Sequence, residues 1–319
     1  MHNESSLCFS LGVLTGEIDV SLDESLVNSD EGEMNARSEK PTSGMPLGHE
    51  RSVRGIQISI IIPAYNEAAR LPRALERIRH YLERRHQGSH VPSGEPGLIE
   101  VIVVDDGSKD GTAGIVLSLR ETFPGLRLVS NGRNRGKGYS VRHGMLEAAG
   151  RVALFTDADL SAPIEEMEKL LGALTSADVA IGSRALEQSL IEIRQSKLRE
   201  LAGKTFNTLV QLITGVHFRD TQCGFKAFVV SRTRIIFEQQ RIEGFGFDPE
   251  LLFLAKRHGL SCLEIPVRWA HDPATKVRVV RDSLRMFCDL ARIRWNWCIG
   301  RYPKAEIQPF AANSPLEID

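Results

Sequence analysis

Short apolar runs alternate with segments of helical periodicity between residues 56 and 159. The runs are "IQISIIIPAY" (56–65), "IEVIVVDDG" (99–107) and "RVALFTDAD" (151–159), and "LPRALERIRHYLERR" (71–85) has the spacing of an amphipathic helix. A strand that is apolar on both faces is typical of a parallel sheet covered by helices. We therefore predict an α/β fold: a mixed, mainly parallel, Rossmann-like sheet with helices on both faces.

Composition divides the chain into three parts. Residues 1–50 contain ten acidic and two basic side chains, whereas the whole chain has a formal net charge of -1. We predict a disordered acidic leader over residues 1–53, because it lacks hydrophobic periodicity, one folded domain over residues 54–302 and a flexible tail over residues 303–319. The remainder beyond the leader is mildly basic, which suits an anionic ligand, but it has no basic run with interleaved aromatic residues that would indicate nucleic acid.

No targeting or membrane-spanning segment is expected. The N-terminal apolar patch has an acidic flank where a signal peptide needs basic residues, and no run of about 18 uncharged apolar residues occurs. The five cysteines are scattered without CxxC spacing, which indicates reduced thiols rather than a zinc site or disulfides. We therefore expect a cytoplasmic protein that meets a membrane only peripherally.

Polar side chains follow three of the predicted strands. They are Tyr65, Asn66, Glu67, Asp105, Asp106, Asp157 and Asp159. In an open α/β sheet, ligands bind outside the carboxyl ends of the strands, close to helix N-termini. The sequence therefore predicts a binding site at this edge of the sheet.

Two carboxylates stand close together in "FTDADLSAP". Side chains at positions i and i+2 of an extended segment point the same way, so we expect Asp157 and Asp159 to face one spot. Two such charges are unfavourable unless one takes up a proton or a cation joins them. Mg²⁺ or Mn²⁺ suits these oxygen ligands and keeps positions for substrate phosphates. The other interpretation is a turn after the strand in which an Asp caps the next helix.

Six segments resemble, in order and spacing, the motifs of family 2 glycosyltransferases of the GT-A fold. They are "SIIIPAYNEAARL", "VIVVDDGSKDGT", "NRGKGYSVRHGM", "LFTDADLSAP", "AIGSR" and "DTQCGFKAF". The last one, with "FGFDPELL" and "EIPVRW" after it, is most similar to dolichyl-phosphate β-glucosyltransferases and their prokaryotic relatives. The resemblance implies an inverting hexosyltransferase that moves glucose from UDP-glucose to a dolichyl or other polyprenyl phosphate at a membrane surface. Two alternatives stay open: a mannosyltransferase that uses GDP-mannose, and a catalytically inactive protein that binds a sugar nucleotide.

The resemblance also implies which residues bind the nucleotide. In similar enzymes, the residues at the places of Pro63, Tyr65 and Glu67 line the pocket for the base and ribose, with Val104 and Asp106 across from them. A tyrosine ring can stack on a planar base, and a carboxylate can accept a hydrogen bond from a ring N–H or a ribose hydroxyl.

Around the diphosphate, the resemblance implies Lys137, Asp157, Ala158, Asp159 and Lys276. Lys137 lies in a "GKG" segment between a strand and a helix and is expected to meet the diphosphate, although glycines there can also serve the turn alone. Asp157 and Asp159 take the positions that hold Mg²⁺ or Mn²⁺. Lys276 matches a basic residue that closes over the diphosphate.

Arginines are implied for the phosphate of the acceptor lipid. Arg184 and Arg199 match residues that hold it in similar enzymes, and a guanidinium group can pair with phosphate through two hydrogen bonds. The other interpretation of Arg199 is a solvated helix face. Asp248 is expected to orient a sugar hydroxyl, since a phosphate acceptor needs no side-chain base. The predicted catalytic residues are Asp157, Asp159, Arg184 and Asp248.

The sequence departs from the family pattern at two places, and one acidic residue has two interpretations. Ser161 stands where many mannosyltransferase relatives have Gln, so we expect no metal contact from its side chain. Gly203 stands where relatives often have a serine that contacts the lipid phosphate. Asp105 either faces the nucleotide or caps the turn of "DDGSKDG".

The segment "VRDSLRMFCDLARIRWNWCIGRY" predicts an amphipathic basic helix. Arg281, Arg285 and Arg292 fall on one stripe, and Trp295 and Trp297 are of a type that favours a membrane interface. We expect the first half of this helix to pack on the domain and the second half to contact the membrane surface.

Overall fold

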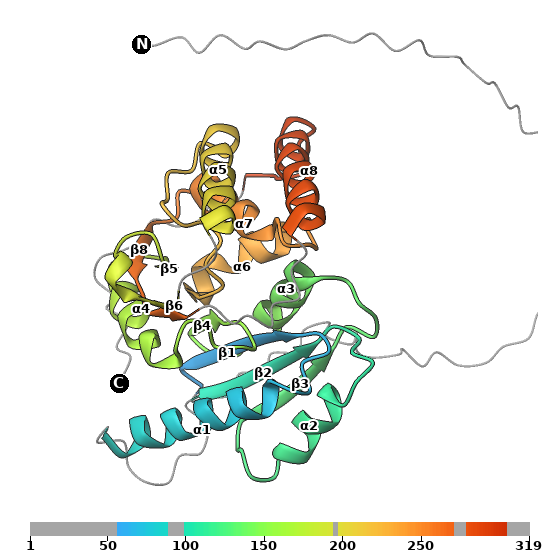
Figure 1. The fold of residues 1–319 in the computed structure, drawn as a ribbon, viewed down its shortest axis with the longest axis vertical. Helices are drawn as coiled ribbons and strands as arrows, with labels where there is room; N and C mark the ends of the chain where they lie inside the picture. Colours follow the sequence, from blue (N-terminus) through green and yellow to red (C-terminus); the bar gives the residue numbers. More distant parts are fainter. Residues whose placement is uncertain (1–55, 89–98, 194–196, 271–278, 305–319) are drawn as a thin grey trace, which may run out of the picture. The chain divides into compact units, whose positions relative to one another are not determined.

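A seven-stranded sheet organises the residues that the computed structural model describes, which are 56–88, 99–193, 197–270 and 279–304 (Figure 1). The strand order is β3-β2-β1-β4-β7-β5-β8, and only β7 runs antiparallel to its neighbours, β4 and β5. The strands are β1 (Ile58–Ala64), β2 (Ile99–Asp105), β3 (Leu126–Ser130), β4 (Val152–Phe155), β5 (Val179–Ser183), β7 (Lys226–Val229) and β8 (Cys262–Pro266). The predicted mixed, mainly parallel sheet is confirmed.

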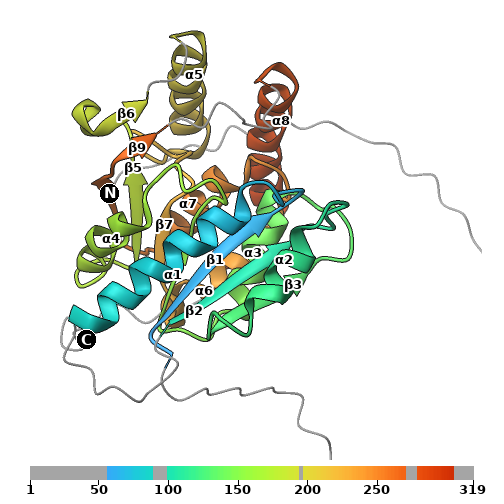
Figure 2. The same cartoon turned by 60° about the horizontal axis from the view of Figure 1, so that its bottom comes forward.

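Helices cover both faces of the sheet (Figures 1 and 2). On one face lie α1 (Leu71–Gly88), α2 (Thr112–Leu119) and α4 (Met167–Ala173), and on the other lie α3 (Lys137–Glu147), α6 (Val230–Gln239) and α7 (Phe247–Arg257). The sheet separates two hydrophobic cores: the first lies against α1, α2 and α4, and the second against α3, α6 and α7. Within β1, Ile60 and Ile62 belong to the first core and Ile61 to the second. Both faces of the strand are therefore buried, which explains its uninterrupted apolar sequence.

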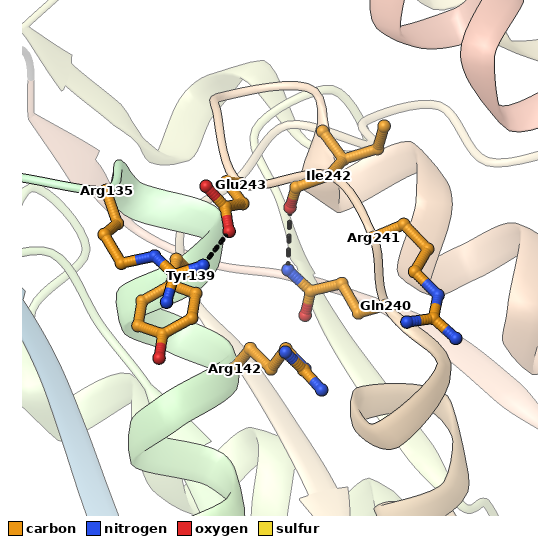
Figure 3. A pocket seen from close by; sticks show the side chains of 7 residues that line it. All are labelled: Arg135, Tyr139, Arg142, Gln240, Arg241, Ile242 and Glu243. Carbon is orange, nitrogen blue, oxygen red and sulfur yellow. Dashed lines mark hydrogen bonds and ion pairs between the residues drawn. The ribbon is translucent and has the colours of Figure 1, made fainter. Parts of the chain in front are cut away.

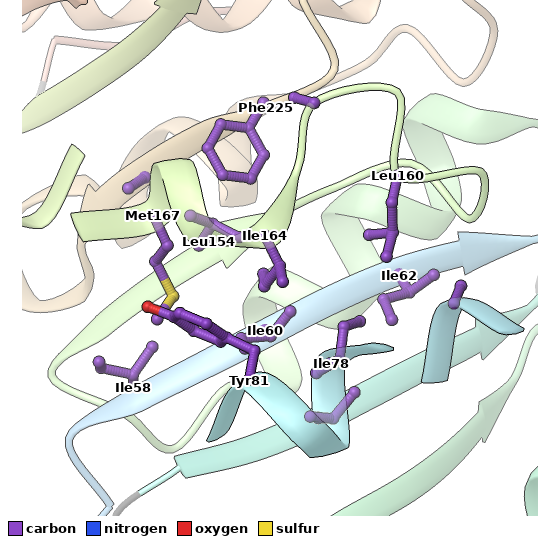
Figure 4. Close-up of a cluster of buried hydrophobic side chains, with 14 of the residues drawn as sticks. Ile58, Ile60, Ile62, Ile78, Tyr81, Leu154, Leu160, Ile164, Met167 and Phe225 are labelled. Atoms are coloured by element: carbon purple, nitrogen blue, oxygen red, sulfur yellow. The ribbon is translucent and has the colours of Figure 1, made fainter. Parts of the chain in front are cut away.

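The core beneath α1 also anchors the turn that follows β4. Figure 4 shows Leu160 in this cluster, with its side chain directed toward Ile62. Leu160 is 6% exposed, and burial of an apolar side chain of this size contributes about 2 kcal/mol. The position of Asp157 and Asp159 is thus fixed by a buried leucine one residue further along the chain.

Two long helices pack against each other beyond the second core, α5 (Lys197–Thr214) and α8 (Val279–Cys298) (Figure 1). The rings of Phe206 and Phe287 meet edge to face, with centroids 6.4 Å apart, and Leu290 and Ile293 of α8 are fully buried. Phe287 is nevertheless partly exposed, and four further apolar side chains of the two helices are exposed: Leu201, Leu212, Leu284 and Trp295. The predicted amphipathic helix is confirmed. Within the described ranges, no helix is long and apolar enough to cross a membrane.

The remaining elements are short. β6 (Ile191–Ile193) and β9 (Trp269–Ala270) form a separate two-stranded sheet, and η1 (Ile164–Glu166) and η2 (Gln188–Leu190) are single 3₁₀ turns. Near the end of the predicted domain, Tyr302 is fully buried, and the carbonyl of Pro303 accepts a 2.9 Å hydrogen bond from Gln239. The predicted leader and the tail beyond residue 304 lie outside the described residues.

Candidate active site

The segment after β4 turns sharply instead of continuing as a strand. The amide of Leu160 donates a 3.0 Å hydrogen bond to the carbonyl of Asp157, and Leu160 has a φ of 49°. The expected extended segment is therefore wrong, although both carboxylates still act on Lys137 and Asp157 acts on Asp159. Oδ1 of Asp159 accepts a 2.9 Å hydrogen bond from the amide of Ser161, so this carboxylate stabilises the turn. The other interpretation is therefore right about the turn but wrong about the helix cap, because η1 has Pro163 at its N-cap and no side-chain cap hydrogen bond.

Asp157 pairs with Lys137, the first residue of α3. Nζ of Lys137 lies 2.5 Å from Oδ1 of Asp157, whose side chain is 34% exposed. Burial alone would lower the pKa of Lys137, but Asp157 and neighbouring carboxylates outweigh it and the pKa lies above its ordinary value. Gly224 touches the other side of this carboxylate, because a Cβ built there would lie 2.7 Å from Cγ of Asp157.

Asp159 is held in a less favourable environment. Burial raises its pKa above the ordinary value and the charge of Asp157 raises it further, while Ser161 and Lys137 oppose the change. Nη1 of Arg70 is 4.0 Å from Oδ2 of Asp159. The two carboxylates therefore repel each other across a small space, and a cation between them would relieve this repulsion.

These residues fit a divalent cation of the kind that substrate phosphates help to hold. Mg²⁺ commonly takes one or two carboxylates from the protein and completes its coordination with phosphate oxygens and water. Asp157 and Asp159 supply that number. Among the described residues, no group of three or more His, Cys, Asp or Glu side chains is arranged for a metal ion, so a protein-only cage is not what this site offers.

The loop before α3 is shaped by Asp106. Its carboxylate accepts 2.8 Å hydrogen bonds from the amides of Arg135 and Gly136 and from the side chain of Asn131. Asp106 is buried, and Gly136 has a φ of 106°, a conformation that favours glycine. The glycine therefore serves the turn, and Asp106, expected at the nucleotide, sets the start of the helix that carries Lys137.

The predicted base pocket at the ends of β1 and β2 is only partly open. Tyr65 is 36% exposed and Pro63 is half-buried, whereas Val104 is fully buried in the core that faces α3. Glu67 is buried and accepts 2.7 Å hydrogen bonds from Nε and Nη2 of Arg70. Oδ1 of Asp105 accepts a 3.2 Å hydrogen bond from the amide of Ser108, as predicted for a turn cap.

Arg184 is fixed by an acidic partner that the sequence interpretation overlooked. Its Nε and Nη2 donate to the two carboxylate oxygens of Asp220 at 2.6 and 2.8 Å, and its amide donates to the same carboxylate at 3.0 Å. Burial alone would raise the pKa of Asp220, but Arg184 lowers it to about 2. The guanidinium also lies 5.3 Å from the centre of the Trp269 ring.

Asp248 contacts a fully buried lysine. Lys226 of β7 is paired with Asp248 of α7, and its Nζ donates a 2.6 Å hydrogen bond to the carbonyl of Cys223. Burial raises the pKa of Asp248 above the ordinary value, while Lys226 and Lys137 oppose the change. Asp248 is 3% exposed, so its nearest chemical partner is Lys226. The orienting role toward a sugar hydroxyl stays a prediction.

Three further predicted site residues cannot be placed in the same way. Ala158 is buried in the core beneath α1, so its side chain packs there. Arg199 belongs to α5, but its side chain lies outside what is described, and so does Lys276 altogether. The residues that the sequence interpretation missed, Asp220 and Lys226, both lie within or beside the quoted "DTQCGFKAF" motif.

Comparison of the chain with known proteins shows the family to which it belongs. Residues 59–232 match the model of glycosyl transferase family 2. A dolichyl-phosphate β-glucosyltransferase of Drosophila melanogaster is 38% identical over 264 residues, which are 79% of this chain and 79% of that protein. One from Trichomonas vaginalis is 34% identical over 265 residues, 80% of this chain and 78% of that protein.

A solved structure supports the fold. The crystal structure of glucosyl-3-phosphoglycerate synthase from Mycobacterium tuberculosis in complex with UDP is 20% identical to this chain, with a TM-score of 0.52 over 80% of this chain and 86% of that chain. The sheet order and these relatives agree. The chain belongs to glycosyltransferase family 2, with the GT-A fold, and within that family to the dolichyl-phosphate β-glucosyltransferases.

Proposed function

We propose that this chain transfers glucose from UDP-glucose to dolichyl phosphate or another polyprenyl phosphate with inversion at the anomeric carbon. The observation that carries the proposal is the cluster formed by Lys137 at the start of α3 and by Asp157 and Asp159 after β4, in a chain related to dolichyl-phosphate β-glucosyltransferases. The cluster combines an ammonium group with two mutually repelling carboxylates, which is the charge pattern that a cation and a diphosphate would complete.

The donor would bind across the ends of β1, β2 and β4. Tyr65 offers an exposed ring for stacking on the base, beside Pro63 and Glu67. Asp157 and Asp159 would hold Mg²⁺ or Mn²⁺, which supplies neutralising charge for the departing diphosphate when bound. Lys137, whose Nζ lies 2.5 Å from Oδ1 of Asp157, would then exchange part of this contact for the diphosphate.

The acceptor phosphate needs little chemical activation. It is anionic at neutral pH, so one of its oxygens attacks the anomeric carbon while the bond from that carbon to UDP breaks, and UDP leaves with the electron pair. The task of the protein is then alignment and charge neutralisation. Arg184, held rigidly by Asp220, is proposed to bind the acceptor phosphate through its remaining N–H groups, together with Arg199. Lys276 is proposed to close over the diphosphate.

A lipid acceptor requires the enzyme to meet a membrane surface. The exposed apolar side chains of α5 and α8, among them Leu284 and Trp295 at 65% each, support peripheral attachment through this pair of helices. The four cysteines in the described part of the chain are free thiols, which supports a reducing compartment and hence the cytoplasmic membrane face.

A matrix of donors and acceptors tests the proposal. Purified full-length protein with Mg²⁺ or Mn²⁺ is offered UDP-glucose or GDP-mannose, each with dolichyl or undecaprenyl phosphate, and the lipid phase is analysed by mass spectrometry. The expected product is a polyprenyl-phosphate hexose formed from UDP-glucose and not from GDP-mannose. Product from GDP-mannose alone would assign a different sugar, and no lipid product from any pair would contradict the proposed acceptor.

A further inference from the structure

A second pocket lies on the other side of α3 from Lys137. It has a volume of about 220 Å³ and is formed by α3, the loop before it and the segment after α6 (Figure 3). Its lining residues are Arg135, Tyr139, Arg142, Gln240, Arg241, Ile242 and Glu243. Lys137 and Tyr139 are two positions apart in a helix and so point about 200° apart. The pocket is thus distinct from the site at Asp157.

Gln240 brings an unpaired acceptor to this pocket. The residue is 2% exposed, and its Nε2 donates to the carbonyls of Gly138 at 2.8 Å and Ile242 at 3.0 Å. Its Oε1 is buried and has no hydrogen-bond partner among the described residues. Figure 3 shows this oxygen directed toward Arg142. A buried oxygen without a hydrogen-bond donor is energetically unfavourable. A ligand that carries an O–H or N–H would supply the missing donor.

The side chains that line the pocket have an excess of positive charge, which favours an anionic ligand. Three arginines and one glutamate line this pocket, and Arg135 is already paired with Glu243 and lies over the Tyr139 ring at 3.6 Å. Arg142 directs Nε to the carbonyl of Phe237 at 2.8 Å, which fixes its guanidinium group.

Arg241 is the most available cation of the pocket. The hydrogen bond from Arg241 to Oε1 of Glu250, at 2.9 Å, comes from its backbone amide, and its side chain is exposed. Arg142 and Arg241 therefore present positive charge that the surrounding described side chains leave uncompensated. Guanidinium groups bind phosphate oxygens in this manner.

We propose that this pocket binds a small phosphate-class anion that carries at least one O–H. Anionic oxygens would accept hydrogen bonds from Arg142 and Arg241, and the O–H would donate to Oε1 of Gln240. Inorganic phosphate at neutral pH has both features, whereas sulfate lacks the donor. The volume is below the 300 to 1,000 Å³ of typical organic-ligand pockets, which suits a ligand of this size.

Calorimetric titration of full-length protein with inorganic phosphate at neutral pH tests the proposal. We expect Arg241→Gln to weaken binding about tenfold or more, because a charge-assisted hydrogen bond is lost, while Arg120→Gln, the same change at an exposed residue of another helix end, leaves it unaltered. Sulfate should bind several-fold more weakly than phosphate. Circular dichroism melts establish that the variants remain folded, which is expected because the side chain of Arg241 is exposed.

Phosphate could also bind at the proposed donor site, so the titration is repeated in Lys137→Gln protein. If the Lys137→Gln protein still binds phosphate and the added Arg241→Gln change abolishes this binding, the result supports the second pocket and says nothing of glycosyl transfer. If Lys137→Gln by itself abolishes phosphate binding, the proposed pocket is overturned. A parallel arm uses phosphatidylcholine vesicles containing phosphatidic acid, in order to separate a lipid headgroup from a free anion. Binding in either arm that depends on Arg241 supports the site. Equal binding by wild type and Arg241→Gln in both arms, or equal affinity for sulfate and phosphate, overturns it.

Discussion

Nζ of Lys137 and Oδ1 of Asp157 lie 2.5 Å apart and join the start of α3 to the turn after β4. In this contact each charge compensates the other. A bound diphosphate and cation would replace this contact with two new ones, in which the ammonium group meets phosphate and the carboxylate meets the metal ion. The resting ion pair is therefore consistent with a site that exchanges partners when the donor enters.

Replacement of the Asp157 carboxylate tests this exchange. We expect Asp157→Asn to lower the rate of glucosyl transfer about a hundredfold or more, because a neutral amide neither balances Lys137 nor holds a divalent cation. The measurement is product formation under saturating metal, with Glu121→Gln, an exposed acid on another part of the surface, as the control. A variant that transfers glucose at the wild-type rate would contradict the role of Asp157.

The polar edge of the sheet was predictable from sequence because strand periodicity locates the carboxyl ends of parallel strands. The directions of individual side chains were not. Leu160 adopts a positive φ because its side chain enters the core, and this bends the segment that the pattern described as extended. Val104 likewise falls on the strand face that packs against α3. These orientations depend on contacts that are remote in sequence.

The buried lysine was beyond sequence interpretation for the same reason. Lys226 lies in an otherwise apolar strand, and its partner Asp248 comes from a helix later in the chain. In the sequence, neither Lys226 nor Asp248 can be distinguished from a charged residue on the protein surface. Only the tertiary pairing of β7 with α7 shows that both are removed from water, and that the backbone of the "QCGFK" segment is held by the ammonium group through Cys223.

Gly224→Ala should separate activity from stability. The new Cβ would clash with the Asp157 carboxylate, which is the end of a side chain that can move. We expect the free energy of unfolding to fall by only about 1 kcal/mol, the low end for an added methyl group in a packed position, because the clashing carboxylate can move. Transfer should fall at least about tenfold. Gly172→Ala is the matched control, because nothing lies within 4 Å of its Cβ position in α4. It should gain about 0.5–1 kcal/mol and keep full activity.

Both glycine variants are measured by urea unfolding and by transfer assay. If Gly224→Ala keeps wild-type activity, the carboxylate of Asp157 does not need the position that it has here. If its free energy of unfolding falls by clearly more than about 1 kcal/mol together with the transfer rate, the clash disturbs the backbone rather than only the carboxylate.

Lys226→Met should destabilise the fold, because Asp248 would be left buried without its partner. We expect a loss of about 3–5 kcal/mol in the free energy of unfolding, and recovery of most of it in the double variant with Asp248→Leu. Arg234→Met breaks an ion pair of 3.2 Å with Glu238 in which both side chains are 50% exposed, and it should cost less than about 1 kcal/mol. A similar small loss for Lys226→Met would show that the buried pair is not what stabilises this region.

Asp220 should contribute to a pH dependence of stability. Its pKa is about 2 in the folded chain and 3.8 in the reference state, so the folded state binds the proton less readily. The stabilisation is therefore present above pH 4 and is lost as the pH falls toward 2, with a total of about 2 kcal/mol. Urea unfolding at several pH values should give a shallower loss in this range for Asp220→Asn than for wild type. Parallel curves for the two proteins would refute the lowered pKa.

The exposed leucines of two helices allow a matched test of membrane contact. Leu284 of α8 is 65% exposed and Leu117 of α2 is 52% exposed. If α5 and α8 face the membrane, Leu284→Ser should weaken binding to anionic vesicles about tenfold, since burial of one leucine in a bilayer interface contributes about 1.5 kcal/mol or more, whereas Leu117→Ser should leave it unchanged. Cosedimentation with vesicles gives the bound fraction. Equal losses in both variants would indicate that attachment is not confined to this pair of helices, and no loss in either would exclude Leu284 from the contact.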